Sequence, residues 1–406
     1  MRTQRTGERA IFRLQWLVAA LVLLLAAGCS EDPTEANSLL ADLPLKGLET
    51  IDTILQAVSG QSVRQYTPMD GLANLVGQAG SYRAITVIQF SPTSFPARDT
   101  AVVYSAQLKL HCVSWYGTQG SSFGFDVYRV NRSWSPYTLT WDSLQTGSFY
   151  ESTVSRGSYN EIKFADTTIT VSLDTAMVRE WLATSTTSTT TKFGIVLVPS
   201  PSTLDAVRGV LEFGAGDSAS YLPTLQIIAG SPTGPGRDTS SYRGGIDTFA
   251  GTDDHGTGPS TLLYVQGGVN YRSAIRFDFS AIPRGAIVNS ATMYLDRDPA
   301  TSKISQFVAD TSLSPHIIAD SVTFRLLDAE DPAAFGRPLP GSPLTFAFNI
   351  RKAAQSWIRG PNYGVMVRVP SAREFSTADI YTFFSPTAAS SSVRPRVKVV
   401  YSIESH

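Results

Sequence analysis

The sequence predicts an all-β protein built from two tandem copies of one unit. Charged residues make up only 17% of the chain, while Ser, Thr, Gly and aromatic residues are plentiful, which favours strands and turns over helices. Short runs of alternating apolar and polar residues lie between clusters of Gly, Pro, Asn and Ser. A series of these runs occurs twice in the same order. These observations predict two β-sandwiches or barrels in tandem.

The N-terminus has the organisation of a secretory signal. Four arginines, the last of them Arg13, precede an uncharged apolar run from Trp16 to Ala27. This run is shorter than the roughly 20 apolar residues that a membrane-spanning helix needs. The sequence "AAGC" resembles the lipobox of bacterial lipoproteins, which implies cleavage of residues 1–28 and acylation of Cys29, for example with palmitate. An ordinary secretory signal with an incidental cysteine and an uncleaved anchor are the alternatives.

Residues 29–45 are predicted to form an acidic tether. The stretch after Cys29, "SEDPTEANS", is acidic, contains Pro and has almost no apolar content, so it is expected to stay solvated. Ser30 replaces the Asp that commonly marks inner-membrane retention in lipoproteins. Glu31 and Asp32 resemble signals for export to the outer face in some bacteria. The resemblance therefore implies a lipid-anchored protein of the bacterial outer membrane that faces the periplasm or the cell surface.

Charge and cysteine content narrow the functional classes that the sequence allows. Without residues 1–28, Lys+Arg falls from 33 to 29 and Asp+Glu from 34 to 33, so the net charge is −4. Nothing in this balance favours nucleic acid, which requires a clustered basic surface. Cys112 is then the one cysteine besides Cys29, and it follows Ala106, Leu108 and Leu110 on one face of a strand at period two. We therefore expect a buried core thiol, with a reactive thiol as the alternative.

The repeat is clearest in one phrase. "SYRAITVIQFS" at Ser81–Ser91 returns as "NYRSAIRFDFS" at Asn270–Ser280. Further predicted matches, in order, join Ile51–Ile54 with Ile246–Phe249, Val102–Leu110 with Ile287–Leu295, Val127–Val130 with Thr323–Leu326, Met177–Leu182 with Ala353–Ile358, and Tyr221–Ile228 with Val393–Val400. Because the order never breaks, we interpret the chain as a tandem duplication with a first domain at 46–230, a linker at 231–244 and a second domain at 245–406.

Within each copy the elements follow from periodicity. In the second copy, Ile275, Phe277 and Phe279 alternate with outward Arg276 and Asp278, which predicts a half-buried strand. Ala291, Met293 and Leu295 are expected to point inward from the next strand. One short helix is expected per copy, because apolar residues recur at helical spacing in two places, Met177, Trp181 and Leu182 in the first copy, and Ile350, Ala353, Ala354, Trp357 and Ile358 in the second.

The second copy resembles a known family. "RSAIRFDFSAIPRGAIVNSATMYL", "AAQSWIRGPNYGVMVR" and "RPRVKVVYS", in this order, resemble the DNRLRE domain family, which is related to the disaggregatase repeat and to a carbohydrate-binding module family. The first copy adds Trp134 and Trp141, which match the spaced tryptophans of the family, whereas the second copy lacks both. The resemblance implies jelly-roll-like β-sandwiches, usually secreted, some of which bind glycans. It supplies no catalytic residues.

Few residues indicate chemistry. The sequence contains no HExxH, Walker or GxSxG motif. Asp253, Asp254 and His255 in "GTDDHGTG" could approach Ca²⁺, but two adjacent acids supply too few ligands, so we expect an exposed turn and neither metal nor cofactor. His316 is expected in a loop next to Pro315.

The best binding candidates are aromatic. Trp115 and Tyr116 precede a Gly/Ser-rich loop in "SWYGTQGSSFGF", where their rings could stay exposed and stack on a sugar, with Gln119 as a polar partner. Packing of these rings over the edge of the sandwich is the alternative.

The functional expectation follows from these observations. We expect a non-catalytic, membrane-anchored lipoprotein that binds a polysaccharide or matrix component. A structural or adhesive surface protein with protein partners is the alternative, and a polysaccharide-degrading enzyme is a weaker one. Ligand identity and oligomeric state are left open by the sequence.

Overall fold

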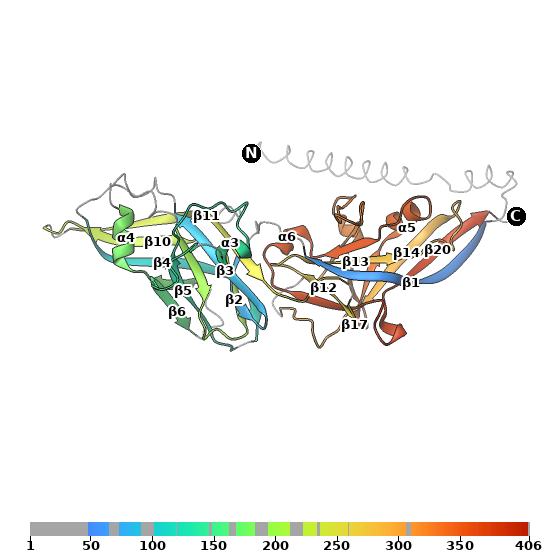
Figure 1. Cartoon of the computed structure of the whole chain (residues 1–406), viewed down its shortest axis with the longest axis horizontal. Coiled ribbons are helices and arrows are strands. Elements are labelled where there is room, and N and C mark those ends of the chain that lie inside the picture. The colour runs from blue at the N-terminus through green and yellow to red at the C-terminus, as the bar shows by residue number, and fades with distance from the viewer. Residues whose placement is uncertain are drawn as a thin grey trace, which may run out of the picture. The chain divides into compact units, whose positions relative to one another are not determined.

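The fold is all-β, as predicted, with two ten-stranded antiparallel sheets in a sandwich-like arrangement (Figure 1). The computed structural model describes residues 48–64, 73–90, 101–118, 120–145, 148–161, 168–182, 194–211, 222–233, 236–258, 260–305 and 310–404. The predicted signal, Cys29 and nearly all of the tether region lie outside these ranges, as does Gln119. Both sheets belong to one compact unit, Ile51–Tyr401.

We call the sheet formed mainly by the first copy the first sandwich. Its strands are β2 (Ala73–Ala79), β3 (Tyr82–Phe90), β4 (Val102–Gly117), β5 (Phe123–Arg129), β6 (Gly157–Glu161), β7 (Thr168–Ser172), β8 (Ile195–Pro199), β9 (Ala206–Leu211), β10 (Thr224–Gly230) and β11 (Arg237–Thr252). Helices α3 (Trp141–Gln145) and α4 (Thr175–Leu182) belong to the same copy.

The second sandwich contains the remaining strands. These are β1 (Leu48–Arg64), β12 (Leu262–Gln266), β13 (Tyr271–Phe277), β14 (Ile287–Asp296), β15 (Ser314–Ile317), β16 (Arg337–Leu339), β17 (Ser342–Asn349), β18 (Val365–Arg368), β19 (Ile380–Phe384) and β20 (Arg396–Glu404). Its helical segments are α5 (Arg351–Trp357), α6 (Ser371–Glu374), η2 (Pro332–Ala334) and η3 (Ser391–Val393).

Each copy contributes its first strand to the sandwich of the other copy. β1 opens the first copy but pairs with β13, from Ala57 opposite Phe277 to Arg64 opposite Tyr271, and neighbours β20. β11, which carries the start of the second copy, pairs with β10 through residues 237–243 and with β3 through residues 244–252. Figure 1 shows β1 running among the C-terminal strands. The two long strands therefore occupy equivalent places in opposite sandwiches.

Because of this strand exchange, two of the predicted domain boundaries differ from the structure. Residues 237–243 of the predicted linker are strand, and residues 48–64 of the predicted first domain lie in the second sandwich. One repeat match is also wrong, because Arg129 and Ile317 occupy the same place opposite β8 and β18, so residues 127–130 correspond to residues 315–318. The predicted partner, Thr323–Leu326, is a separate segment. Backbone pairing identifies these equivalences, whereas short sequence matches leave them ambiguous.

The alternation predicted for the strands is confirmed. Ile275, Phe277 and Phe279 are buried while Arg276 and Asp278 are exposed, and the inward set on β14 is buried as well. Cys112 lies in the core of the first sandwich. Both predicted helices are present as α4 and α5, and each carries a tryptophan on its buried face, Trp181 in α4 and Trp357 in α5. The expectation of one helix per copy is incomplete, because α3 and α6 add a second short helix to each.

Candidate functional site

The predicted aromatic site is partly buried. Tyr116 is only 6% exposed, belongs to an apolar cluster with Tyr82 and Phe249, and donates its hydroxyl to the carbonyl of Ser376 at 3.0 Å. Burial and the nearby Asp379 carboxyl raise the pKa of Tyr116. The expectation of an exposed Tyr116 ring is therefore wrong, since β4 continues to Gly117 and carries this ring inward.

Trp115 faces a different environment. It is half-buried against the core of the first sandwich, and its carbonyl accepts a hydrogen bond from Ser305 Oγ at 2.6 Å. Because successive side chains of a strand point to opposite faces, Trp115 and Tyr116 cannot form one flat binding platform. Gln119, the third predicted member, lies outside the described residues.

The two acids of the "GTDDHGTG" segment, Asp253 and Asp254, lie in different environments. Asp253 is buried, and its Oδ2 accepts a hydrogen bond from Gln266 Nε2 and lies 3.0 Å from His255 Nε2. Burial acts to raise the pKa of Asp253, but the hydrogen bonds from His255, Ser81 and Gln266 hold it below its usual value. Tyr264 stacks on the His255 ring at 4.4 Å between centroids. The expectation of an exposed turn is wrong for Asp253, which belongs to an internal polar network.

Asp254 does form the exposed part of that turn, accepting the Gly256 N–H at 3.0 Å. Since the two carboxylates serve different internal contacts, they do not converge on one point. Over the part of the chain that the structure describes, no three His, Cys, Asp or Glu side chains gather as a metal site.

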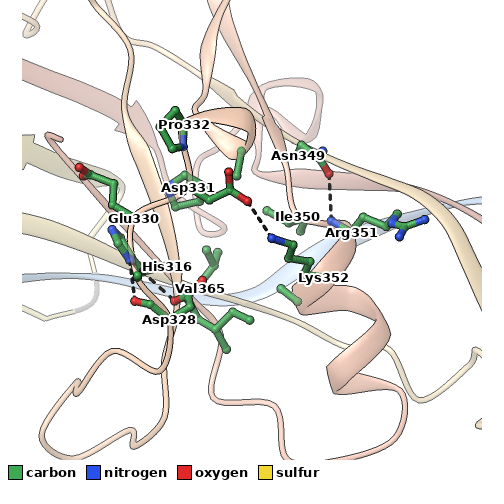
Figure 2. A pocket seen from close by; sticks show the side chains of 15 residues that line it. His316, Asp328, Glu330, Asp331, Pro332, Asn349, Ile350, Arg351, Lys352 and Val365 are labelled. Carbon is green, nitrogen blue, oxygen red and sulfur yellow. Dashed lines mark hydrogen bonds and ion pairs between the residues drawn. The ribbon is translucent and has the colours of Figure 1, made fainter.

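A cavity of about 560 Å³ opens beside β15 and the start of α5 (Figure 2). His316 lines it, but from the buried strand β15 and not from the loop that we expected. His316 Nε2 lies 3.0 Å from Ser314 Oγ, and its Nδ1 lies 3.7 Å from Asp328 Oδ1. These three residue types in this order are those of a nucleophilic triad.

The geometry does not support nucleophilic catalysis at this cavity. Ser314 is fully buried and does not line the cavity, so a substrate there cannot reach its hydroxyl. Asp328 Oδ1 accepts the Ile317 N–H at 2.8 Å, which fixes the loop against β15. The three side chains therefore have a structural role, because they hold β15 and the loop that carries Asp328 together.

The other acidic groups around this cavity are also engaged internally, whereas the exposed Arg351 guanidinium makes no ion pair among the described residues. Glu330 accepts both the N–H and the hydroxyl of Ser371, at 2.9 and 2.7 Å. Asp331 caps η2 and pairs with Lys352 at 2.9 Å, an interaction that Figure 2 shows along the wall. Because each carboxylate already holds a structural partner, none is available as a paired general acid and base.

A second cavity, of about 600 Å³, is lined by three arginines of this kind. Its lining includes Arg276 at the end of β13, Arg284 in the following loop and Arg359 after α5, and all three are exposed. Within the described ranges, no ion pair or side-chain hydrogen bond engages these guanidinium groups. We call this cavity, defined by Arg276, Arg284 and Arg359, the arginine pocket.

The lining of the arginine pocket also includes one acid, Asp278, and one residue of the exchanged strand β1, Val58. The pKa of the Asp278 carboxyl is lowered chiefly by hydrogen bonds from Ser280, whose N–H it accepts at 2.9 Å. Val58 of β1 also lines the pocket and is 53% exposed. The first strand of the chain therefore supplies part of a pocket in the second sandwich.

Sequence reasoning placed Arg276 and Asp278 on an outward face but did not find the pocket. Arg284 and Arg359 lie 75 positions apart in the sequence, and only the packing of α5 beside the β13–β14 connection brings their segments together. A usable signal was present in "RFDFSAIPRG", where two arginines flank a predicted turn.

Comparisons with known proteins identify no family for this chain. No protein-family model matches the sequence, and no curated protein matches it. Among the solved structures, a chain described as "Structure of the Macrobrachium rosenbergii Nodavirus" aligns over 88% of this chain and 90% of its own at 9% identity. Its TM-score of 0.16 is too low to support any argument from it. Among the described residues, no helix has the length and apolar character to cross a bilayer.

Proposed function

We propose that this protein is a non-catalytic, membrane-anchored extracytoplasmic lipoprotein that binds a polysaccharide or matrix component through its β-sandwich modules. The single observation that carries the binding role is the arginine pocket, an open cavity whose three guanidinium groups make no hydrogen bond or ion pair among the described residues, although the charge of Arg276 acts on Asp278. Cationic side chains that stay unpaired in an open cavity remain available to a ligand.

The anchoring part of the proposal rests on the sequence. The basic and apolar N-terminal segment and "AAGC" support acylation of Cys29 and attachment to the outer membrane. Metabolic labelling with palmitate should mark the full chain, and Cys29→Ser should abolish the label and release the protein from the membrane fraction. Equal labelling of the Cys29→Ser variant would contradict the anchor.

The binding role can be tested with affinity gels. The full chain in nonionic detergent is run through gels that contain one neutral or one acidic polysaccharide each. Retardation by at least one polysaccharide, relative to an inert protein of similar charge, is the expected result. Unchanged migration in every gel would reject polysaccharide binding.

A structural or adhesive role with protein partners has one specific observation in its favour. The outer face of β1 carries three exposed apolar side chains, Leu48, Ile54 and Val58, exposed by 61, 60 and 53%, with polar residues between them. If no gel retards the chain, cross-linking at β1 is the next measurement.

A further inference from the structure

We propose that the arginine pocket binds the carboxylate or sulfate groups of an acidic polysaccharide. This inference rests on the proposed polysaccharide-binding function and specifies its ligand class. It places polysaccharide binding in the second sandwich and not at the aromatic segment of Trp115 and Tyr116.

The cations come from three separate segments that meet at one cavity. Arg276 is the penultimate residue of β13, Arg284 lies before β14 and Arg359 follows α5. Asp278 is the one acid in the lining, and it already accepts the Ser280 N–H. The lining therefore carries three positive charges against one negative charge. Planar guanidinium groups can bind carboxylate and sulfate oxygens through two parallel hydrogen bonds.

The absence of acidic partners here is local. The chain has 34 acidic and 33 basic residues, so acids are not scarce. Elsewhere in the second sandwich, Arg272 and Arg368 both pair with Glu374, and Arg396 pairs with Asp296 at 2.6 Å. Arg276 interacts electrostatically with Asp278, but the lining keeps an excess of positive charge, which a bound anion offsets.

The base of the pocket is rigid and apolar. Phe279 and Trp357 are buried in its lining, with ring centroids 5.4 Å apart, and Ile358 lies beside them. Apolar surroundings lower the local dielectric and strengthen attraction between a guanidinium and an anion. Val58 adds an exposed apolar group that can contact the C–H face of a sugar ring.

Among the described residues of the first sandwich, the strand equivalent to β13 does not repeat the charges of the arginine pocket. Ile88 lies opposite Ile195 of β8 as Ile275 lies opposite Val365 of β18, so the position of Arg276 is taken by the neutral Gln89 in β3. The two copies share their strands, so this outward position can change without disturbing the fold. We therefore expect anion binding by the second sandwich alone.

The test compares three gels and two matched variants. Dextran and dextran sulfate share one backbone and differ in sulfate, while polygalacturonate presents carboxylates. The pocket variant is Arg276→Ala/Arg284→Ala/Arg359→Ala. The control, Arg325→Ala/Arg351→Ala/Lys352→Ala, removes three exposed positive charges from elsewhere in the second sandwich. Both variants have the same net charge, so bulk electrostatic attraction falls equally in both.

We expect the full chain to bind dextran sulfate, polygalacturonate or both, and dextran weakly or not at all. The pocket variant should weaken acidic binding at least about tenfold, and the control less than about twofold, because charge-assisted hydrogen bonds are lost only in the former. Retardation by one acidic gel alone identifies sulfate or carboxylate as the preferred group.

Other outcomes separate the two proposals. Equal acidic binding by the pocket variant, or equal loss in both variants, would overturn the pocket and keep polysaccharide binding. Binding to dextran as strong as to dextran sulfate would do the same. No retardation in any gel would overturn both proposals. If the triple variant unfolds, the single changes Arg284→Ala and Arg359→Ala, both outside strands, provide the same comparison.

Discussion

β1 and β11 occupy equivalent places in the two sandwiches but are held by different interactions. Each is long, and each neighbours the last strand of one copy and the Tyr-Arg strand of that copy. In β1 only Ser62 is buried among 17 residues, whereas seven of the 16 residues of β11 are buried, Phe249 and Ala250 among them. β1 is therefore held mainly by backbone hydrogen bonds, and β11 by backbone hydrogen bonds and side-chain burial.

The exchange is possible because the copies are duplicates. A strand that fits one sandwich has backbone geometry suited to the other, so exchange of identical elements costs little. The difference in burial shows that equivalent backbone pairing can coexist with unequal side-chain contributions. It also makes the second sandwich dependent on the chain segment that directly follows the predicted tether.

The largest effect should come from deleting residues 48–64. Without β1, β13 and β20 lose their shared partner and expose unpaired backbone groups, while the first sandwich keeps all ten strands. Calorimetry should show loss of one cooperative transition, and hydrogen exchange should show loss of protection in β13 and β20 but not in β3. A synthetic peptide of residues 48–64 should restore protection. Unchanged protection in β13 would show that β1 is dispensable.

The next largest loss of stability should come from disrupting a buried ion cluster that involves β13, the strand with which β1 pairs. Arg272 of β13 donates to Glu374 at 2.8 and 3.0 Å, and Arg368 also contacts this carboxylate, which is fully buried. Glu374→Gln leaves two buried guanidinium groups without a countercharge, which costs roughly 3–5 kcal/mol. Urea denaturation measures the loss. Asp331→Asn, at an exposed pair, is the control and should leave the midpoint unchanged.

A pair of substitutions compares the two strands directly. Phe249→Ala in β11 removes a buried ring and should cost about 3–5 kcal/mol of unfolding free energy. Ile54→Ala in β1 truncates a side chain that is 60% exposed and should stay within about 0.5 kcal/mol. Denaturant midpoints provide both values. Equal costs would contradict the conclusion that side-chain burial distinguishes the strands.

The smallest effect concerns pH. Burial raises the pKa of Asp379 to about 6, and its Oδ1 accepts the Ser305 N–H at 2.7 Å while Oδ2 has no partner. The folded state therefore keeps this proton when the unfolded chain, with a pKa near 3.8, has released it. Stability should fall as pH rises from about 4 to about 6, by roughly 1–3 kcal/mol in total.

Asp379→Asn removes this titration and provides the test. The variant should match the parent at pH 4 and exceed its stability at pH 8. An identical pH profile for the Asp379→Asn variant and the parent would assign the titration to another group.

The sequence by itself determined the features that depend on neighbouring residues. Period two predicted the buried faces of β13 and β14, and helical spacing predicted α4 and α5, because these patterns require only that one face meets a core. The repeated Tyr-Arg phrase correctly predicted that β3 and β13 are equivalent.

Tertiary structure alone decided the features that depend on distant partners. The sequence of β1 does not reveal which sandwich it joins, because the duplicated sheets offer nearly the same backbone edge. The inward position of Tyr116, the burial of His316 and Asp379, and the meeting of Arg276, Arg284 and Arg359 all arise from segments far apart in the chain. Local periodicity reports which face of an element is apolar, and only packing reports what that face or its edge contacts.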